Sequence, residues 1–176
     1  VLGGTYSLED PLVFTPEDSG AAECPVTYRG WGDRPAVISG GKRLTGFRQS
    51  GRLWTLTLDD VKAGKWYFNQ LYVNGHRRLW ARTPNDGTYF RIRSPLSGAK
   101  ESCLGFIYAK DDVRPWENVE DAVFVVFGSW YNTIHHVDKL DVPNRTVWFT
   151  NRSGRPFSWY ERNLRYYVEN IEEELD

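Results

Sequence analysis

The first 47 residues alternate between very short apolar runs and turn-forming residues. Proline, glycine or aspartate separates each run from the next, and the runs lie at residues 5–8, 12–14, 26–29 and 36–39. Three or four residues are too few for a stable sheet built from hairpins alone. Stacked coils of a solenoid solve this problem, because each short strand pairs with its counterpart one coil away. We therefore expect short coils over residues 1–51.

The pattern changes near Ser50, where longer strands are predicted. Residues 71–79 read as a strand, an Asn74-Gly75 turn and a second strand, which is the strongest short-range hairpin signal. Further strands are expected at residues 54–58, 104–108, 122–127, 130–140 and 146–149. This series of antiparallel strands predicts a β-sandwich or small barrel over residues 52–152.

The last segment, residues 153–176, has a helical spacing. Its apolar positions follow one another at intervals of 4, 3, 1 and 3, at Tyr160, Leu164, Tyr167, Val168 and Ile171. Such intervals place side chains on one face of a helix. The sequence therefore predicts one short C-terminal helix.

Composition excludes several classes of protein. The 176 residues carry 22 Lys and Arg against 23 Asp and Glu, a net charge of −1. Overall positive charge therefore does not recruit nucleic acid, and we expect no nucleic-acid partner. No apolar run approaches the roughly 20 residues of a membrane-spanning helix, so no membrane partner is expected either. The chain begins at Val1 without a signal-type leader, and we expect it to be a piece of a longer protein.

Charge is nevertheless uneven along the chain. Residues 61–110 hold nine basic and two acidic side chains, a net charge of +7. Residues 111–141 hold two basic and seven acidic ones, a net charge of −5. Two interpretations remain open: solvated faces that pair across the sheet, or a basic surface for an acidic ligand such as a uronate or a sulfated sugar.

The sequence offers no signature of a metal, nucleotide or flavin, and we expect no cofactor and no metal site. Cys24 and Cys103 are expected to be unpaired thiols in the core, although one disulfide remains an alternative. Adjacent acids such as Asp111 and Asp112 do not form a catalytic pair on a strand, because neighbouring residues point to opposite faces. We therefore expect solvated acids and no catalytic residue within the chain.

The strand at residues 130–140 carries the main candidates for ligand binding. Trp130, Asn132, Ile134 and His136 would share one face of it. An aromatic plane, an amide and an imidazole suit a sugar, which stacks through its apolar face and hydrogen-bonds through its hydroxyls. The alternative is that Trp130 and Ile134 fill the core and His136 lies at its rim.

Three more residues complete the predicted carbohydrate-binding set. Arg82 precedes the rigid turn that begins at Pro84, where it could clamp a carboxylate or brace the protein's own carbonyl groups. Trp116 and the pair Trp159-Tyr160 lie at the edges of segments and are the better candidates for exposed stacking platforms, and the two tryptophans join the predicted set. Most other aromatic side chains are expected in the core.

Several segments, taken in order, resemble right-handed parallel β-helix glycoside hydrolases secreted by bacteria. The opening carries the resemblance in VLGGTYSL (1–8), PLVF (11–14), VTYR (26–29) and VISGG (37–41). Similar segments follow at LYVNG (71–75), ARTPN (81–85) and RYYVEN (165–170). None of these segments matches a catalytic motif of such enzymes, so the resemblance carries over no catalytic residue.

The resemblance implies a mainly β fold with three parts. Short right-handed parallel β-helix coils would occupy residues 1–51, an inserted antiparallel sandwich or barrel residues 52–152, and a helical return segment residues 153–176. The catalytic carboxylates would lie in later coils beyond Asp176, and these coils would be the main partner of the chain. The protein would be extracellular or periplasmic.

The expected function is therefore non-catalytic: the N-terminal part of a polysaccharide-degrading enzyme that shapes the cleft for a plant or host glycan. A stand-alone carbohydrate-binding module and a purely structural insert without a ligand remain as alternatives.

Overall fold

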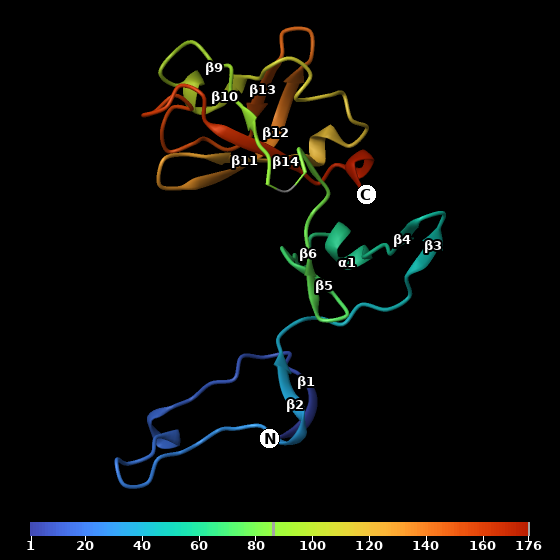
Figure 1. Cartoon of the computed structure of the whole chain (residues 1–176), viewed down its shortest axis with the longest axis vertical. Helices are drawn as coiled ribbons and strands as arrows, with labels where there is room; N and C mark the ends of the chain where they lie inside the picture. The colour runs from blue at the N-terminus through green and yellow to red at the C-terminus, as the bar shows by residue number, and fades with distance from the viewer. Residues whose placement is uncertain (86, 176) are drawn as a thin grey trace. The chain divides into compact units, whose positions relative to one another are not determined.

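The computed structural model describes residues 1–85 and 87–175 of the chain (Figure 1). It is mainly β, and it divides into two compact units, Val1–Tyr67 and Phe68–Asp176. The domain boundaries expected at residues 51–52 and 152–153 stay predictions. No helix among the described residues has the length and apolar character needed to span a membrane.

The Val1–Tyr67 unit is built around one parallel pair of strands. β1 (Leu2–Ser7) runs alongside β2 (Trp31–Ser39), with Gly4 opposite Ala36 and Ser7 opposite Ser39. The unit also contains a 3-10 turn and a short hairpin followed by one helical turn: η1 (Pro16–Asp18), β3 (Arg48–Ser50), β4 (Leu53–Thr55) and α1 (Asp59–Lys62). One parallel pair does not make a β-helix, whose coils are defined by stacking on further coils.

Two strands predicted in this unit are absent. Residues 12–14 and 26–29 are irregular, and they form the two arms of the connection between β1 and β2. Phe14 and Tyr28 join the arms through an edge-to-face contact with ring centroids 5.1 Å apart, and an isolated bridge joins Ala21 to Cys24 near the tip. The prolines beside these arms cannot donate to a ladder, which limits strand pairing there.

The Phe68–Asp176 unit holds one large antiparallel sheet, which confirms the expectation of a mainly antiparallel β region. Its strand order is β7-β14-β11-β12-β13-β10-β9, with β8 also paired to β14. The strands are β7 (Arg82–Thr83), β8 (Phe90–Arg91), β9 (Ser94–Pro95), β10 (Gly105–Ile107), β11 (Val123–Phe127), β12 (Asn132–Asp141), β13 (Thr146–Phe149) and β14 (Arg165–Glu169). A separate hairpin, β5 (Leu71–Val73) with β6 (His76–Arg78), turns at Asn74-Gly75 as predicted. Three 3-10 turns complete the unit: η2 (Glu101–Cys103), η3 (Val119–Asp121) and η4 (Glu172–Glu174).

The sheet is strongly curled around its core. Phe106 of β10 and Tyr166 of β14 lie four strands apart in the sheet order, yet their ring centroids are 5.0 Å apart. In a flat sheet they would be roughly 19 Å apart, because neighbouring strands are about 4.8 Å apart. The segment from β8 to β9 links the two ends: Ile92 donates to the Leu164 carbonyl and Arg93 to the Ile107 carbonyl. The sheet thus closes on itself in the manner of a small barrel.

The core lies entirely within this second unit. Its buried hydrophobic residues run from Ile92 to Ile171, and no residue of Val1–Tyr67 belongs to the set. Edge-to-face, tilted and stacked rings fill its centre, contributed by Phe106, Phe124, Phe149, Phe157 and Tyr166. Aromatic pairs of this kind add to the free energy gained by burying their area.

The predicted C-terminal helix is wrong. Residues 165–169 form strand β14, and only the short 3-10 turn η4 follows. Tyr166 and Val168 are buried while their neighbours are not, a period of two that fits a strand. Tyr160 has a positive φ of 66°, which interrupts any helix starting there. The spacing of 4 and 3 among the apolar residues was therefore coincidental.

Candidate functional site

One face of the curled sheet points away from the core, and we call it the outer face. On β14 it carries Arg165, Tyr167 and Glu169, because the alternate residues Tyr166 and Val168 are buried. Residues directly opposite one another in an antiparallel ladder share a face. The register therefore places three rows on the outer face: Arg91, Arg165, Phe127 and Asn132; then Tyr167, Val125 and Ile134; then Arg82, Glu169, Val123 and His136.

This register brings together three of the predicted binding residues, but not at one point. Asn132 and His136 share the outer face of β12 with Ile134, as the strand pattern predicted. Four residues of strand separate them, which is roughly 13 Å. Asn132 thus lies in the row of Arg165, whereas His136 lies in the row of Arg82.

Arg82 braces the loop that follows it. Its Nε donates to the Pro84 carbonyl at 3.0 Å, and its Nη2 donates to the Thr88 carbonyl at 3.1 Å. Its guanidinium carbon also lies 3.7 Å from the centroid of the Tyr167 ring. These contacts fit the bracing role that the sequence left open, while a role in clamping a ligand stays a prediction.

Glu169 stands directly opposite Arg82 and is half-buried. Burial raises the pKa of the Glu169 carboxyl, although a hydrogen bond with Tyr167 and the positive charges of Arg82 and Arg77 oppose this shift. Burial and then the Glu169 charge raise the pKa of Tyr167 to about 12. The same hydrogen bond favours the ionised carboxyl and the protonated phenol, so it holds Tyr167 as a donor.

The row at the other end of β14 has a different charge pattern. Arg165 stands directly opposite Arg91, and both side chains are exposed. The Arg165 guanidinium carbon lies 5.1 Å from the Tyr89 ring centroid and 5.8 Å from that of Phe127. Arg91 donates through Nη1 to the Asn163 carbonyl at 3.2 Å. Among the described residues, neither arginine forms an ion pair.

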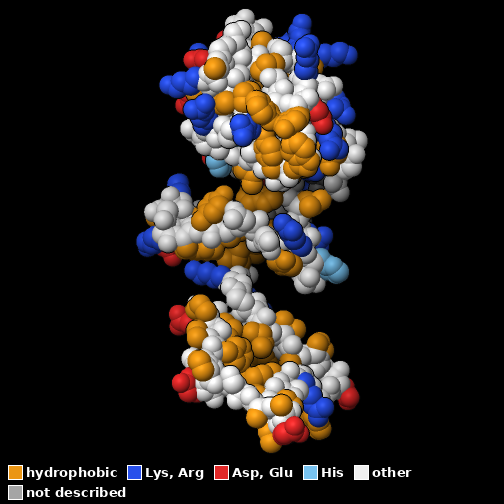
Figure 2. Space-filling view, turned by 90° about the vertical axis from the view of Figure 1, so that its left-hand side faces the viewer, with side chains coloured by type: hydrophobic (Ala, Val, Ile, Leu, Met, Phe, Trp, Pro, Cys, Tyr) orange, Lys and Arg blue, Asp and Glu red, His pale blue; other side chains and the backbone are white. Residues whose placement is uncertain are grey.

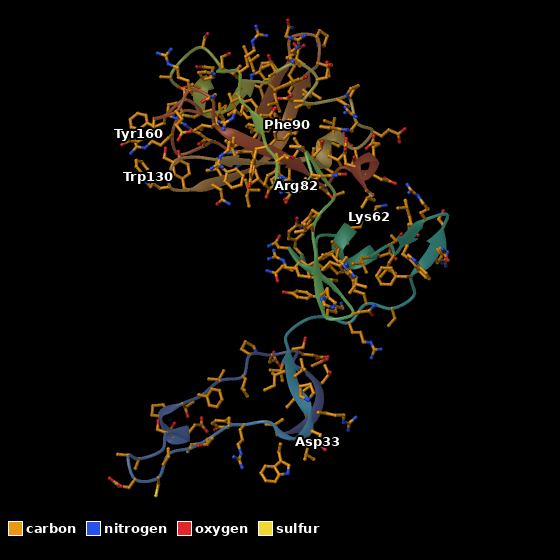
Figure 3. All side chains as sticks on the ribbon, in the orientation of Figure 1. Asp33, Lys62, Arg82, Phe90, Trp130 and Tyr160 are labelled. Atoms are coloured by element: carbon orange, nitrogen blue, oxygen red, sulfur yellow. The ribbon has the colours of Figure 1, made fainter. Side chains whose placement is uncertain are left out.

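Two exposed aromatic side chains meet where the β11–β12 hairpin turns. The hairpin closes with a 2.7 Å hydrogen bond from the Gly128 amide to the Tyr131 carbonyl. Trp130 in this turn is 75% exposed, and Tyr160, in the loop before β14, is 70% exposed. Their ring centroids lie 4.8 Å apart at an interplanar angle of 83° (Figure 3). The alternative that Trp130 and Ile134 fill the core is therefore wrong.

Trp159 extends this exposed aromatic cluster. It is 42% exposed and contacts Tyr160 edge to face, with ring centroids 5.6 Å apart. The guanidinium carbon of Arg155 lies 4.8 Å from the Trp159 ring centroid. We call Trp130, Trp159 and Tyr160 the aromatic corner.

Trp116 was predicted to be an exposed platform, and that expectation is wrong. Its side chain is 6% exposed and packs within the hydrophobic core. Its indole Nε1 is buried without a hydrogen-bond partner among the described residues. Because Trp116 follows Pro115 at the edge of a segment, the sequence suggested exposure, but residues 113–116 fold back onto the core.

The two adjacent histidines have opposite environments. His135 faces the core, where its ring stacks on Phe149 with centroids 4.8 Å apart. Its Nδ1 lies 3.2 Å from the Asn151 carbonyl and its Nε2 lies 2.8 Å from Thr133 Oγ1, so Nδ1 carries the proton and Nε2 accepts one. Burial lowers the pKa of His135, which favours this neutral form. His136 is exposed on the outer face, in the position predicted for a hydrogen-bonding imidazole.

Asp112 has a structural role. It accepts a 3.0 Å hydrogen bond from the hydroxyl of the buried Tyr166, and burial raises the pKa of the Asp112 carboxyl.

Within residues 1–85 and 87–175, no group of three or more His, Cys, Asp and Glu side chains could hold a metal ion. Both cysteines are free thiols, and Cys103 is buried as predicted, but Cys24 is exposed, so its expected place in the core is wrong.

Sequence reasoning missed Tyr89, Arg91 and Arg165, and it did not bring Tyr160 together with Trp130. The signal that could have found Arg165 is the alternation over residues 164–169, in which buried Leu164, Tyr166 and Val168 alternate with outward side chains. Read as a strand, this segment places Arg165 on a solvent face. Tyr160 lies beside the predicted Trp159, but only its left-handed backbone and the packing of the loop bring it to Trp130.

Comparison with known proteins identifies no relative. No family model matches the chain, and no curated protein and no solved structure is significantly similar to it.

Proposed function

We propose that this chain is a non-catalytic, glycan-binding part of a β-helix polysaccharide-degrading enzyme, acting in the extracellular or periplasmic space. The observation that carries the proposal is the contact between Trp130 and Tyr160, two aromatic rings that remain 75% and 70% exposed. Large aromatic side chains that cluster in solvent are typical of binding surfaces.

The aromatic corner has the chemistry that a sugar ring requires. The C–H face of a sugar is apolar and stacks on an aromatic plane, while its hydroxyl groups need hydrogen-bonding side chains nearby. Asn132 supplies such an amide directly after the hairpin turn that carries Trp130. The corner would form one wall of the glycan-binding cleft of the parent enzyme.

The Val1–Tyr67 unit supports the β-helix part of the proposal. Its parallel pair, β1 with β2, is the pairing that neighbouring coils of a β-helix make. Large apolar side chains of this unit remain in solvent, among them Leu2 at 67%, Val13 at 70% and Trp31 at 61%. Figure 2 shows hydrophobic side chains gathered on its visible face. Further coils of the parent enzyme would cover these side chains.

The test is a titration of plant and host oligosaccharides against the chain, followed by ligand-observed NMR, which reports binding and product release together. We expect binding without turnover, and a loss of binding in Trp130→Ala and Tyr160→Ala. Trp54→Ala is the matched control, because Trp54 is 64% exposed in the Val1–Tyr67 unit.

Three outcomes would contradict the proposal. Product release would place a catalytic centre inside the chain. Glycan binding that survives both Trp130→Ala and Tyr160→Ala would show that the aromatic corner does not bind the glycan. The absence of binding to any glycan would favour the alternative of a purely structural insert.

A further inference from the structure

We infer that the glycan is anionic, with its carboxylate or sulfate group held by Arg165 and Arg91 on the outer face. This inference rests on the proposed function and names the class of ligand for the same surface.

The two arginines form an uncompensated pair of positive charges. Arg165 and Arg91 stand directly opposite each other in the β14–β8 ladder, and like charges in this position repel. Neither has an ion-pair partner among the described residues, whereas Arg82 in the other row faces Glu169. An anion between the two guanidinium groups would replace repulsion by charge-assisted hydrogen bonds, which guanidinium groups form in bidentate geometry with carboxylate and sulfate-like oxygens.

The aromatic side chains beside Arg165 hold it in place and offer a ring to the sugar. Tyr89 contacts Phe127 edge to face, with centroids 5.2 Å apart, and it contacts Tyr167 at 6.3 Å. Arg165 lies against both Tyr89 and Phe127, yet Tyr89 remains 39% exposed. A guanidinium group stacked on aromatic rings is oriented before a ligand arrives, which lowers the entropic cost of binding.

The arginine pair and the aromatic corner are linked through Phe127 and through the segment that leads into β14. Phe127 is the last residue of β11, it stands opposite Arg165 on one side and Asn132 on the other, and the turn that carries Trp130 follows it. Tyr160 precedes Arg165 by five positions in the same loop-to-strand segment. A glycan stacked at the corner could therefore extend along this row and place an acidic group between the arginines.

The test compares matched probes on the whole chain: a galacturonate pentamer, its methyl ester, a sulfated galactose oligomer and its desulfated form. We expect the two acidic probes to bind at least about tenfold more tightly than their neutral counterparts, since hydrogen bonds to charged groups are the strong ones. Affinity for the acidic probes should fall as salt is raised. The preferred acidic probe would distinguish a carboxylate from a sulfate ligand, and both results support the inference.

Variants locate the site and keep the two proposals separate. Arg165→Gln should lose about tenfold in affinity for the acidic probe while keeping its affinity for the neutral one. Arg52→Gln, in the Val1–Tyr67 unit, is the control and should bind the acidic and the neutral probe with the affinities of the unsubstituted chain. Thermal unfolding of each variant would show that it folds. Equal binding of acidic and neutral probes, or tight binding of a single-stranded oligonucleotide, would overturn the inference. Failure of every sugar to bind would overturn the proposed function itself.

Discussion

The guanidinium group of Arg82 lies 3.7 Å from the centroid of the Tyr167 ring while it donates to two backbone carbonyls of the loop that follows β7. The Arg82 side chain therefore contacts both the loop after β7, which is a strand at the edge of the sheet, and the Tyr167 ring on the outer face. Arg82→Lys keeps the charge but lacks the planar fork of N–H donors that reaches both carbonyls while it lies on the Tyr167 ring. We expect a loss of about 2 kcal/mol in the free energy of unfolding, measured by chemical denaturation. Arg78→Lys on the β6 hairpin is the control, and equal effects at both positions would show that Arg82 is no brace.

Glu169 should make stability depend on pH. Its folded pKa is raised by burial, so the folded state holds its proton more tightly than the unfolded state does. The stabilisation from the protonated carboxyl is fully present below the unfolded pKa and is lost as pH rises through the folded value. Glu169→Gln should therefore gain stability relative to the parent chain as pH rises from 4 to 7, measured by denaturation at each pH. Glu161→Gln is the control, because Glu161 is exposed, and its effect on stability should not change over this pH range. If the stability of Glu169→Gln instead falls relative to that of the unsubstituted chain over this pH range, the charges of Arg82 and Arg77 lower the Glu169 pKa by more than burial raises it.

Gly128 leaves room for the Tyr131 ring in the hairpin that presents Trp130. A Cβ atom at this position would lie 2.8 Å from the Tyr131 ring, so the ring would have to move. We expect Gly128→Ala to cost about 1 kcal/mol of stability and to weaken glycan binding. Gly154→Ala is the matched control, because a Cβ atom there meets nothing within 4 Å. Both variants are compared by thermal unfolding and by glycan titration. Equal stability and equal affinity of the two variants would show that a Cβ atom at residue 128 does not displace the Tyr131 ring.

Hydrogen exchange should separate the two units. Backbone amides of β11 and β14, which pair within the closed sheet over the core, should exchange slowly. Amides of β1 and β2 should exchange quickly in the isolated chain, because no buried hydrophobic residue lies in Val1–Tyr67. Mass spectrometry of peptic fragments measures both. Strong protection of β1 would show that this unit is stable without further coils.

The sequence predicts the β class, the hairpin at Asn74-Gly75 and the face shared by Asn132 and His136, because these depend on local patterns. It fails at residues 160–171, where three buried residues, Leu164, Val168 and Ile171, and two residues outside the core, Tyr160 and Tyr167, together mimic a helical spacing. It also fails at Trp116, whose burial depends on how its loop returns to the core. The contact between Trp130 and Tyr160 joins residues 30 positions apart, so only the fold reveals it.

The most direct test of the account is an NMR spectrum of the indole N–H signals during titration with the best-binding glycan. Trp130 lies exposed in the aromatic corner and Trp116 is buried in the core, so one spectrum contains both the reporter and its control. We predict that the Trp130 signal shifts with increasing glycan while the Trp116 signal stays in place, and that the Trp130 shift disappears in Tyr160→Ala. A glycan that binds without moving the Trp130 signal would contradict this prediction.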